Sequence, residues 1–435
     1  MWLLLKFYSL IHFLLLPLIL PFELRKRAPK RRLVWIKEKF GFISPPNFKT
    51  SRKILWVHAV SLGEVRAVTK FLELATEKFN ICLTTTTETG RTFAEKLMAE
   101  NPNLKIYYNP FDLTFVIKRF LKRINPDALI LVETEIWPNM IYVSSKYIPI
   151  FLINARLSDK SFKKYKVLSF FFKPIFNKLT AICVQSENYL HKFRAIGVNM
   201  NNLYLTGNLK FDITIPFIEF EELEPLRRPV IIAGSTHEGE ERLILSSFLK
   251  IREASSLLLV PRHPERFERV YKLCREFNGG EDVLTLRYSE FITNQKIYKD
   301  LKDKQKKKLV IVVDKIGILA SLYRVADVAI IGGSFIPHGG QNPLEAIYWK
   351  VPVIVGPHME NFPFVEEFVK ERAILQTSPE RLSEAINLIL NDREFREGLV
   401  RRAYAMFMSL TGGSKKTLGI IESYFNQPEK HKNFL

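Results

Sequence analysis

Cysteine is scarce in this chain of 435 residues. The three cysteines, Cys82, Cys183 and Cys274, lie far apart in mostly apolar surroundings, and no Cys-x-x-Cys pair occurs. A disulfide-stabilised scaffold needs paired cysteines at short spacings. The pattern therefore favours core thiols in a reducing compartment.

Motifs that bind metal or nucleic acid are also missing. None of the eight histidines belongs to a His-Glu-x-x-His motif. Residues 237–241 (HEGEE) are rich in possible ligands, but their alternation does not suit one helix face, so we expect no metal and no cofactor. Without an RNP motif, a zinc finger or a basic zipper, nucleic acid is not the expected partner.

Acidic residues are outnumbered by basic ones. The chain has 65 lysines and arginines against 45 aspartates and glutamates, which gives a net charge of +20. This balance predicts an acidic partner, and anionic lipid or a phosphorylated substrate remain once nucleic acid is set aside. A hydrophobic content of 47% excludes a disordered chain, and the length suggests two domains.

One apolar segment, residues 2–22, is about as long as a membrane-spanning helix. Six basic residues follow it between Arg25 and Arg32, and no small-residue cleavage site separates the two. We therefore predict a retained membrane anchor over residues 1–24 and a basic juxtamembrane segment over residues 25–50. The basic segment should face anionic lipid headgroups on the cytoplasmic side.

An alternative for this segment stays open. Pro17 and Pro21 weaken a straight span, so the helix could instead lie in the membrane interface without crossing it. Both interpretations place the body of the protein at a membrane surface.

Apolar runs typical of buried strands alternate with helix-like segments along the rest of the chain. This alternation predicts an α/β fold with doubly wound parallel sheets. The predicted strands are residues 54–60, 81–85, 128–132, 148–153, 181–185 and 203–206, and then residues 230–233, 256–260, 283–286, 310–313, 328–331 and 351–355.

The alternation breaks once, in a proline-containing and acidic stretch over residues 212–229, which we interpret as a linker. Two tandem Rossmann-like domains with a cleft between them describe the GT-B glycosyltransferase architecture. The predicted domains are residues 51–211 and 230–420, with a tail over residues 421–435. In such sheets ligands bind at the carboxyl ends of the strands.

The loop over residues 330–345 (IIGGSFIPHGGQNPLE) combines an apolar run, two glycine pairs and the start of a helix. Asn342 can cap this helix, Pro343 suits its first position and Glu345 falls in its first turn. A ligand could meet backbone N–H groups and one carboxylate here. The alternative is a purely structural cap, since Asn342-x-x-Glu345 is close to a capping box.

Arg262 and His263 directly follow a predicted strand, at a position where a phosphate-binding pair would lie. An ion pair with Glu265 at the start of the next helix is the alternative.

Glu64 also follows a predicted strand. From the residues alone, a capping box of Ser61-x-x-Glu64 is the favoured explanation. Glu133 could equally belong to an ion pair at the end of a strand, and Lys210 could be an ordinary surface lysine.

Seven segments in order resemble the 3-deoxy-D-manno-octulosonic acid (Kdo) transferases of lipopolysaccharide assembly. They are residues 56–64 (WVHAVSLGE), 133–139 (ETEIWPN), 154–158 (NARLS), 207–212 (GNLKFD), 235–241 (STHEGEE), 260–267 (VPRHPERF) and 339–345 (GGQNPLE). The resemblance runs from the apolar segment to about residue 415. It implies an inverting, metal-independent lipid IVA Kdo transferase that moves Kdo from CMP-Kdo to a phosphorylated lipid A precursor.

The resemblance also implies roles for individual residues. Glu64 would be the general base, in an opened capping box, and Glu133 and Lys210 would support the transition state. The implied CMP-binding residues are Pro261, Arg262, His263, Ile316, Gly317, Ile318, Asn342, Pro343, Leu344 and Glu345. Family members commonly carry a carboxylate where this chain has Ile318, so we expect a backbone contact there, and Gln341 stands where some relatives carry histidine.

The implied location is the bacterial inner membrane, with the catalytic domains on the cytoplasmic side. Two alternatives are kept. One is a different GT-B enzyme of the cell envelope that uses a UDP-sugar. The other is a non-catalytic lipid-binding scaffold, which would tolerate loss of Glu64 and Glu345.

Overall fold

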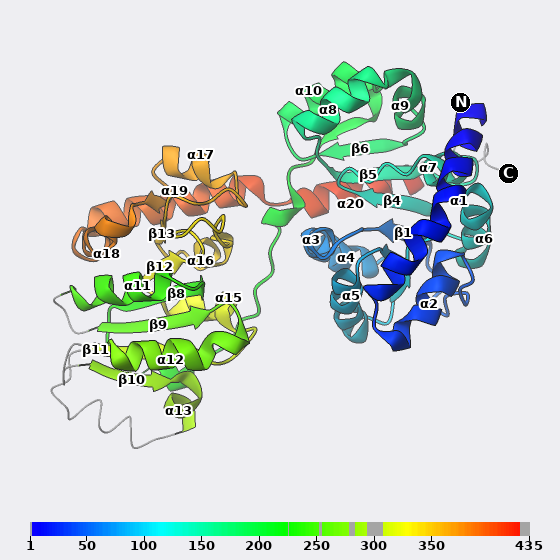
Figure 1. Cartoon of the computed structure of the whole chain (residues 1–435). Coiled ribbons are helices and arrows are strands. Elements are labelled where there is room, and N and C mark those ends of the chain that lie inside the picture. Colours follow the sequence, from blue (N-terminus) through cyan, green and yellow to red (C-terminus); the bar gives the residue numbers. More distant parts are fainter. Residues whose placement is uncertain (1, 225, 252–254, 278–282, 294–307, 427–435) are drawn as a thin grey trace. The chain divides into compact units, whose positions relative to one another are not determined.

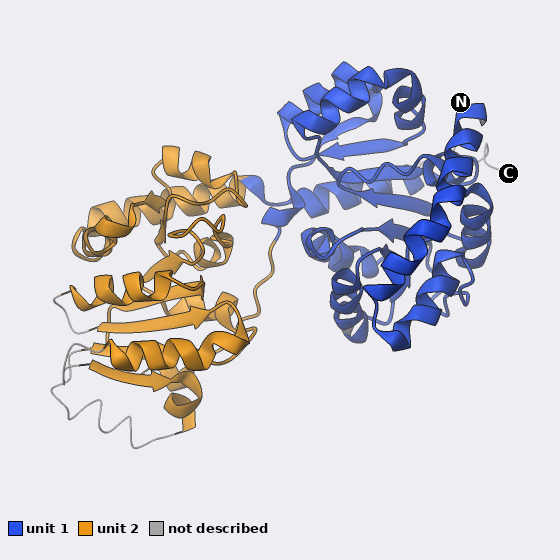
Figure 2. Cartoon of the chain, viewed as in Figure 1, with its two compact units in different colours: residues 1–212, 410–435 blue, residues 213–409 orange. Residues whose placement is uncertain are grey.

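A computed structural model describes residues 2–224, 226–251, 255–277, 283–293 and 308–426 of the chain (Figure 1). The chain forms two compact units. Unit 1 comprises residues 1–212 and 410–435, and unit 2 comprises residues 213–409 (Figure 2). Each unit is built around its own parallel sheet.

The sheet of unit 1 has seven strands in the order β3-β2-β1-β4-β5-β6-β7, and all neighbours are parallel. Alternate residues of its central strands enter two separate cores: Trp56 and Leu129 belong to one, and Leu55 and Ile130 to the other. Both faces of the sheet are therefore covered, which is why these strands read as continuous apolar runs. The strands are β1 (Ile54–His58), β2 (Asn80–Thr85), β3 (Leu104–Tyr108), β4 (Ala128–Val132), β5 (Ile150–Ala155), β6 (Ala181–Val184) and β7 (Leu203–Leu205).

The helices of unit 1 flank this sheet. They are α1 (Trp2–Arg25), α2 (Pro29–Lys39), α3 (Leu62–Ala67), α4 (Thr69–Thr76), α5 (Glu88–Glu100), α6 (Thr114–Ile124), α7 (Pro138–Ser144), α8 (Asp159–Val167), α9 (Ser169–Phe176), α10 (Glu187–Ile196) and α20 (Gly413–Phe425), with 3₁₀ turns at Met200–Asn202 and Leu209–Phe211.

Unit 2 repeats the same plan, with seven parallel strands in the order β10-β11-β9-β8-β12-β13-β14. They are β8 (Val230–Thr236), β9 (Ser255–Pro261), β10 (Val283–Arg287), β11 (Lys308–Val312), β12 (Val328–Ile331), β13 (Val353–Val355) and β14 (Leu375–Gln376). Its helices are α11 (Glu240–Leu249), α12 (Phe267–Glu276), α13 (Tyr288–Thr293), α15 (Leu319–Leu322), α16 (Leu344–Tyr348), α17 (Val365–Lys370), α18 (Leu382–Asn391) and α19 (Arg393–Leu410), with 3₁₀ turns at Glu221–Leu223, Pro264–Arg266, Tyr323–Val325 and Pro379–Arg381.

The predicted fold class of two Rossmann-like parallel sheets is confirmed, and each predicted strand is present, with exact bounds for β4 and β12 and shifted ends for the others. Two strands were missed. Residues of β3 alternate between buried and half-buried positions at the edge of the sheet, so no continuous apolar run marks it. The other, β14, has only two residues.

The structure moves the last domain boundary. Helix α20 packs against α4 of unit 1, and the Asp212 carboxylate accepts hydrogen bonds from Gly412 N and Ser414 N, both at 2.5 Å. The predicted second domain, which extended to residue 420, therefore ends about ten residues earlier. Part of the predicted tail is the ordered end of α20, and residues 427–435 lie outside the described part of the chain.

The predicted linker is attached to unit 2. Ser321 Oγ donates to Pro216 O (2.8 Å), and Tyr288 OH donates to Glu222 (2.6 Å). These contacts explain why residues 213–229 group with unit 2.

Helix α1 is, by length and composition, able to cross a membrane over Leu3–Arg25. One of its faces packs on unit 1: Leu5 and Leu16 are 3% exposed, and Ser9 Oγ accepts a hydrogen bond from Asn139 Nδ2 (3.0 Å). Tyr8 also bonds the buried carboxyl of Asp112. The opposite face is apolar and exposed, at Leu3, Phe7, Ile11, Leu14, Leu18 and Phe22.

The strand orders fix where ligands should bind. In unit 1 the chain runs from β1 through β2 to β3 on one side and then crosses to β4 on the other side of β1, and in unit 2 β8 lies likewise between β9 and β12. Loops diverge at such a switch point, which leaves a crevice at the carboxyl ends of the strands. Ligand-binding residues are therefore expected in the segments that follow β1, β4, β8, β9 and β12.

Candidate active site

Glu64 lies at the switch point of unit 1, in the first turn of the helix that follows β1. Its Oε2 accepts a hydrogen bond from Val60 N (2.7 Å), and its Oε1 accepts one from Ser61 Oγ (3.1 Å). Glu64 N in turn donates to Ser61 Oγ at 3.4 Å. The structural explanation offered by the sequence, a capping box, is therefore present.

The capping box is closed in this structure, and its opening in the active form stays a prediction. Each carboxylate oxygen has two lone pairs, and in Glu64 each accepts only one of these hydrogen bonds. The box thus leaves acceptor capacity and fixes the carboxylate. Burial raises the pKa of Glu64, and the charge of Glu133 raises it further, against the lowering effects of the Val60 N–H and Ser61.

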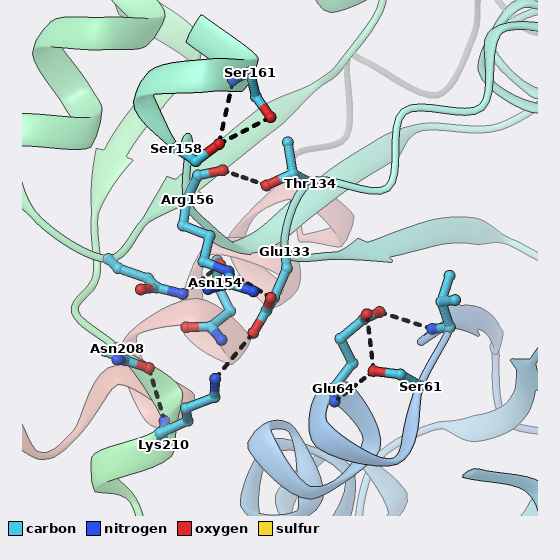
Figure 3. A network of polar contacts seen from close by, with 12 residues as sticks. Ser61, Glu64, Glu133, Thr134, Asn154, Arg156, Ser158, Ser161, Asn208 and Lys210 are labelled. Carbon is cyan, nitrogen blue, oxygen red and sulfur yellow. Dashed lines mark hydrogen bonds and ion pairs between the residues drawn. The ribbon is translucent and has the colours of Figure 1, made fainter. Parts of the chain in front are cut away.

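Glu133 follows β4, the neighbour of β1, and its backbone is in the left-handed region at φ 59°. Such a conformation costs a non-glycine residue on the order of 1–3 kcal/mol. It aims the buried side chain at two cations: Arg156 Nε is 2.6 Å from Oε2, and Lys210 Nζ is 3.3 Å from Oε1. Figure 3 shows both cationic side chains pointing towards Glu133.

The ion pair leaves Lys210 partly free to act on a ligand. Its side chain is 46% exposed, whereas that of Glu133 is 6% exposed. The loop of Lys210 is fixed from behind, because Leu209 N donates to Asn154 Oδ1 (3.0 Å) and Lys210 N to Asn208 Oδ1 (3.1 Å). Three segments distant in sequence thus place one lysine beside one carboxylate.

Two residues of this site were not singled out from the sequence. Arg156 is the second partner of Glu133, and Glu135 is a third carboxylate in the same place, bonded by Trp137 Nε1 at 2.9 Å. Burial and then the charge of Glu64 raise the pKa of Glu135 to about 7. The sequence signal that could have indicated Glu135 is its position two residues after Glu133, directly behind a predicted strand.

In unit 2 the predicted CMP-binding residues follow β9, β11 and β12. After β9, Pro261 is buried while Arg262 and His263 are exposed. Glu265 forms no ion pair with Arg262, and Arg262 has no acidic partner among the described residues. The residue near Glu265 is His263, whose Nδ1 lies 4.0 Å from Glu265 Oε1.

After β11, the backbone turns through Gly317 at φ 86° with open space where a Cβ would be. Ile316 is 71% exposed and Ile318 is 7% exposed. An exposed backbone between them fits the expectation of main-chain contacts.

After β12, the helix begins one residue later than predicted. Pro343 occupies the N-cap of α16 instead of its first turn, and Asn342 Oδ1 accepts from Leu344 N at 3.1 Å. Asn342 therefore closes a local turn, a common alternative to capping for this side chain. Leu344 is buried and Glu345 is half-buried, and the charge of Glu345 adds to burial in raising the pKa of Tyr323.

The glycine pairs of this loop permit close backbone approach. A Cβ on Gly332 would lie 2.3 Å from Ser235 O, and one on Gly340 would lie 2.3 Å from Met359 Sδ. The segment after β12 is thereby packed closely against the end of β8 and against the segment after β13. Among the described residues, no group of three or more His, Cys, Asp or Glu side chains could hold a metal ion.

Comparison with known proteins identifies both halves of the chain. The sequence model of a family described as 3-deoxy-D-manno-octulosonic-acid transferase (kdotransferase) matches residues 35–213. A second model, described as glycosyl transferases group 1, matches residues 293–406.

Individual relatives agree with the family models. The 3-deoxy-D-manno-octulosonic acid transferase of Haemophilus influenzae is 32% identical over 440 residues, which cover 97% of this chain and 99% of that protein. The transferase of the same name from Bordetella pertussis is 30% identical over 388 residues, 85% of this chain and 87% of that protein.

A solved structure shares the fold at low identity. A putative UDP-N-acetylglucosamine 2-epimerase from Listeria monocytogenes has a TM-score of 0.53 at 13% identity, covering 88% of this chain and 100% of that one. At such identity the likeness concerns the fold alone. The full-length match to the Haemophilus influenzae protein identifies the family: this chain belongs to the 3-deoxy-D-manno-octulosonic acid (Kdo) transferases, the glycosyltransferases of lipopolysaccharide biosynthesis.

Proposed function

We propose that this protein is an inverting transferase that moves Kdo from CMP-Kdo to a phosphorylated lipid A precursor of the lipid IVA type. The observation that carries the proposal is the cluster in unit 1. A fixed carboxylate with a raised pKa, Glu64, lies at the switch point with the charged group of Glu133, Arg156 and Lys210.

In this mechanism Glu64 takes the proton from an acceptor hydroxyl as its oxygen attacks the anomeric carbon of Kdo. The bond from that carbon to the CMP oxygen breaks, and CMP leaves with the electron pair. One carboxylate on the face opposite the leaving group suffices for such an inversion. The raised pKa makes Glu64 a better proton acceptor than an ordinary surface glutamate.

Lys210 and Glu133 support the transition state. Negative charge builds up on the departing phosphate, and an ammonium group stabilises it electrostatically. Glu133 holds Lys210 at 3.3 Å and cancels part of its charge when no ligand is bound, so that the buried carboxylate positions the lysine.

Unit 2 binds CMP through the loops after β9, β11 and β12. Arg262, unpaired with any acid among the described residues, meets the phosphate, and the backbone at residues 316–318 meets the base. Residues 342–345 and the Glu345 carboxylate bind the ribose. Buried Pro261, Pro343 and Leu344 shape these loops and do not present polar groups of their own.

The decisive experiment is mass spectrometry of a tetra-acylated lipid A precursor incubated with the protein and CMP-Kdo. We expect a mass increase by whole Kdo units. A product formed from a UDP-sugar instead would favour the alternative envelope glycosyltransferase. If no sugar is transferred from either donor, and Glu64→Gln still binds lipid like the parent, the non-catalytic scaffold is the better explanation.

Glu345→Ala should weaken CMP binding by about tenfold to a hundredfold. A carboxylate that accepts ribose hydroxyls makes charged hydrogen bonds of roughly 1.5–3 kcal/mol each. Calorimetric titration of CMP measures the change. Glu366→Ala is the matched control, because Glu366 occupies the first turn of α17 in the same unit and is exposed. A lower melting temperature with unchanged CMP affinity would leave Glu345 only a structural role.

We propose further that α1 lies in the membrane interface on the cytoplasmic side of the inner membrane. Its inner face is joined to Asn139 and Asp112 of unit 1, and a helix that crossed the bilayer would have to give up these polar contacts. Its outer face offers large apolar side chains to acyl chains, and exposed Lys30 and Arg32 of α2 offer positive charge to anionic headgroups.

The side on which the N-terminus lies tests this arrangement. In sealed inverted inner-membrane vesicles, a short tag before residue 1 should be cut by added protease, because an interfacial helix keeps both of its ends on the cytoplasmic side. Protection of the tag, with cleavage of a C-terminal tag as the accessible control, would establish a spanning helix instead.

A further inference from the structure

Three imidazole rings meet at the switch point of unit 2. His237 follows β8, His263 follows β9 and His338 follows β12, which are neighbouring strands in the order β9-β8-β12. The ring centroids of His237 and His338 are 3.9 Å apart, and those of His237 and His263 are 5.8 Å apart. The transfer mechanism above uses neither His237 nor His338.

The central ring of this histidine cluster is held firmly. His237 is 7% exposed, and its backbone N–H donates to Glu240 Oε1 at 2.7 Å. The same oxygen accepts from Gly333 N at 2.6 Å, so one fully buried carboxylate ties the loop after β8 to the loop after β12. His263 and His338 are exposed, so the cluster has one fixed ring and two rings open to solvent.

The surroundings of the rings are positive. Arg262 is adjacent in sequence to His263 and has no acidic partner in the described part of the chain, whereas Arg266 is neutralised by buried Glu241 at 2.7 Å. Burial first, and then the charges of His338, His263, Arg266 and Arg262, lower the pKa of His237 to about 4. An anion bound between the three imidazole rings and Arg262 would be stabilised electrostatically.

The tautomer of His237 suits a donor role. Gln341 Nε2 lies 3.0 Å from His237 Nε2, and an amide N–H that donates to this nitrogen leaves the ring proton on Nδ1. This contact also joins the histidine cluster to the loop that carries Asn342 and Glu345. Gln341, to which no role was assigned from the sequence, therefore positions the ring of His237.

The chemistry of the donor supplies a suitable anion. Kdo is an octulosonic acid, so its carboxylate is attached directly to the anomeric carbon that reacts. CMP contributes a single phosphate, for which Arg262 is already available. A CMP-Kdo molecule therefore brings a second anionic group close to its phosphate.

Given the proposed function, we propose that His237, His263 and His338 form the subsite for the carboxylate of the transferred sugar. Neutral imidazole N–H groups donate to the carboxylate, and no covalent step is involved. Because this carboxylate and the reacting carbon are joined by one bond, the histidine cluster fixes the orientation of the sugar for attack. The histidine cluster would also bind a donor whose sugar carries a carboxylate in preference to nucleotides of neutral sugars.

The experiment compares the Michaelis constant for CMP-Kdo with the inhibition constant of the product CMP, which lacks the sugar. We expect His338→Ala and His237→Gln to raise KM for CMP-Kdo by about tenfold or more, the usual loss for a hydrogen bond to a charged group. The inhibition constant for CMP should stay within about threefold of the parent value, well below one tenfold step in affinity. His358→Ala, which removes a histidine of the same unit outside the cluster, should change neither.

Two results would overturn the subsite. If both constants rise together, the histidine cluster belongs to the nucleotide site, and if neither changes, it binds no part of the donor. His338 is exposed, so its variant keeps the test valid even where a change at buried His237 disturbs folding. The activity of the parent protein with CMP-Kdo is measured before that of any variant. If the parent does not use CMP-Kdo, the proposed function itself is refuted.

Discussion

Glu64→Gln should lower kcat by about 10²–10⁴-fold, the range over which a positioned general base accelerates reactions. Glutamine keeps one oxygen that can accept from Val60 N, and its amide N–H can donate to Ser61 Oγ, so the cap is retained while the proton acceptor is lost. The substitution thus separates the two roles of this side chain. Rates of Kdo transfer at saturating CMP-Kdo, together with the melting temperature, give the answer.

Two further variants sharpen this test. Ser61→Ala removes the two hydrogen bonds of Ser61 Oγ and should cost roughly 0.5–2 kcal/mol of stability, with Glu64 still held by Val60 N–H and present to act. Glu73→Gln changes an exposed glutamate of α4 and should alter neither rate nor stability. If Glu64→Gln retains activity within a few-fold of the parent, Glu64 is a helix cap and the base is another group, with Glu135, whose pKa is raised to about 7, the next candidate.

The pH dependence of the parent follows from the same carboxylate. A base works only when deprotonated, so kcat should rise with pH through the pKa of Glu64. Burial and Glu133 raise that pKa, so the acidic limb of the profile should lie above the ordinary range of a glutamate. In Glu133→Gln the neighbouring negative charge is gone, and the limb should move to lower pH.

Lys210→Met should reduce kcat on the order of 10²-fold or more, as removal of one transition-state donor does in other enzymes. The fold should survive, because the side chain is 46% exposed and Glu133 keeps Arg156 as a partner at 2.6 Å. Binding of CMP should change little, since the nucleotide is assigned to unit 2. Single-turnover measurements with preformed CMP-Kdo give the rate of the transfer itself.

Lys53→Met is the matched control for Lys210. Lys53 is also in unit 1, is 49% exposed and is near an acid, with its Nζ 3.8 Å from Asp127 Oδ1. Lys53 directly precedes β1, whereas Glu64 follows that strand, so the two residues lie at opposite ends of β1. Equal losses in both variants would mean that general positive charge matters, and no loss in Lys210→Met would remove this lysine from the transition state.

The helices, the strands and the fold class could be predicted from residue patterns alone. Runs such as residues 128–132 and 328–331 are apolar throughout because both faces of a parallel sheet are covered, and this property is visible without the structure. The motif segments likewise marked Glu64, Glu133, Lys210 and Glu345 as places to examine. Such patterns are local, so a single pass along the chain detects them.

The way in which distant segments combine could not be predicted from such patterns and is seen in the three-dimensional contacts. Strand order put Glu64 and Glu133 at one switch point, and the left-handed backbone of Glu133 turned its carboxylate towards Arg156 and Lys210. The return of α20 to unit 1 rests on two backbone hydrogen bonds to Asp212. The histidine cluster joins three loops in the same way. These features depend on contacts between residues tens to hundreds of positions apart, and a local pattern carries no information about which of them will meet.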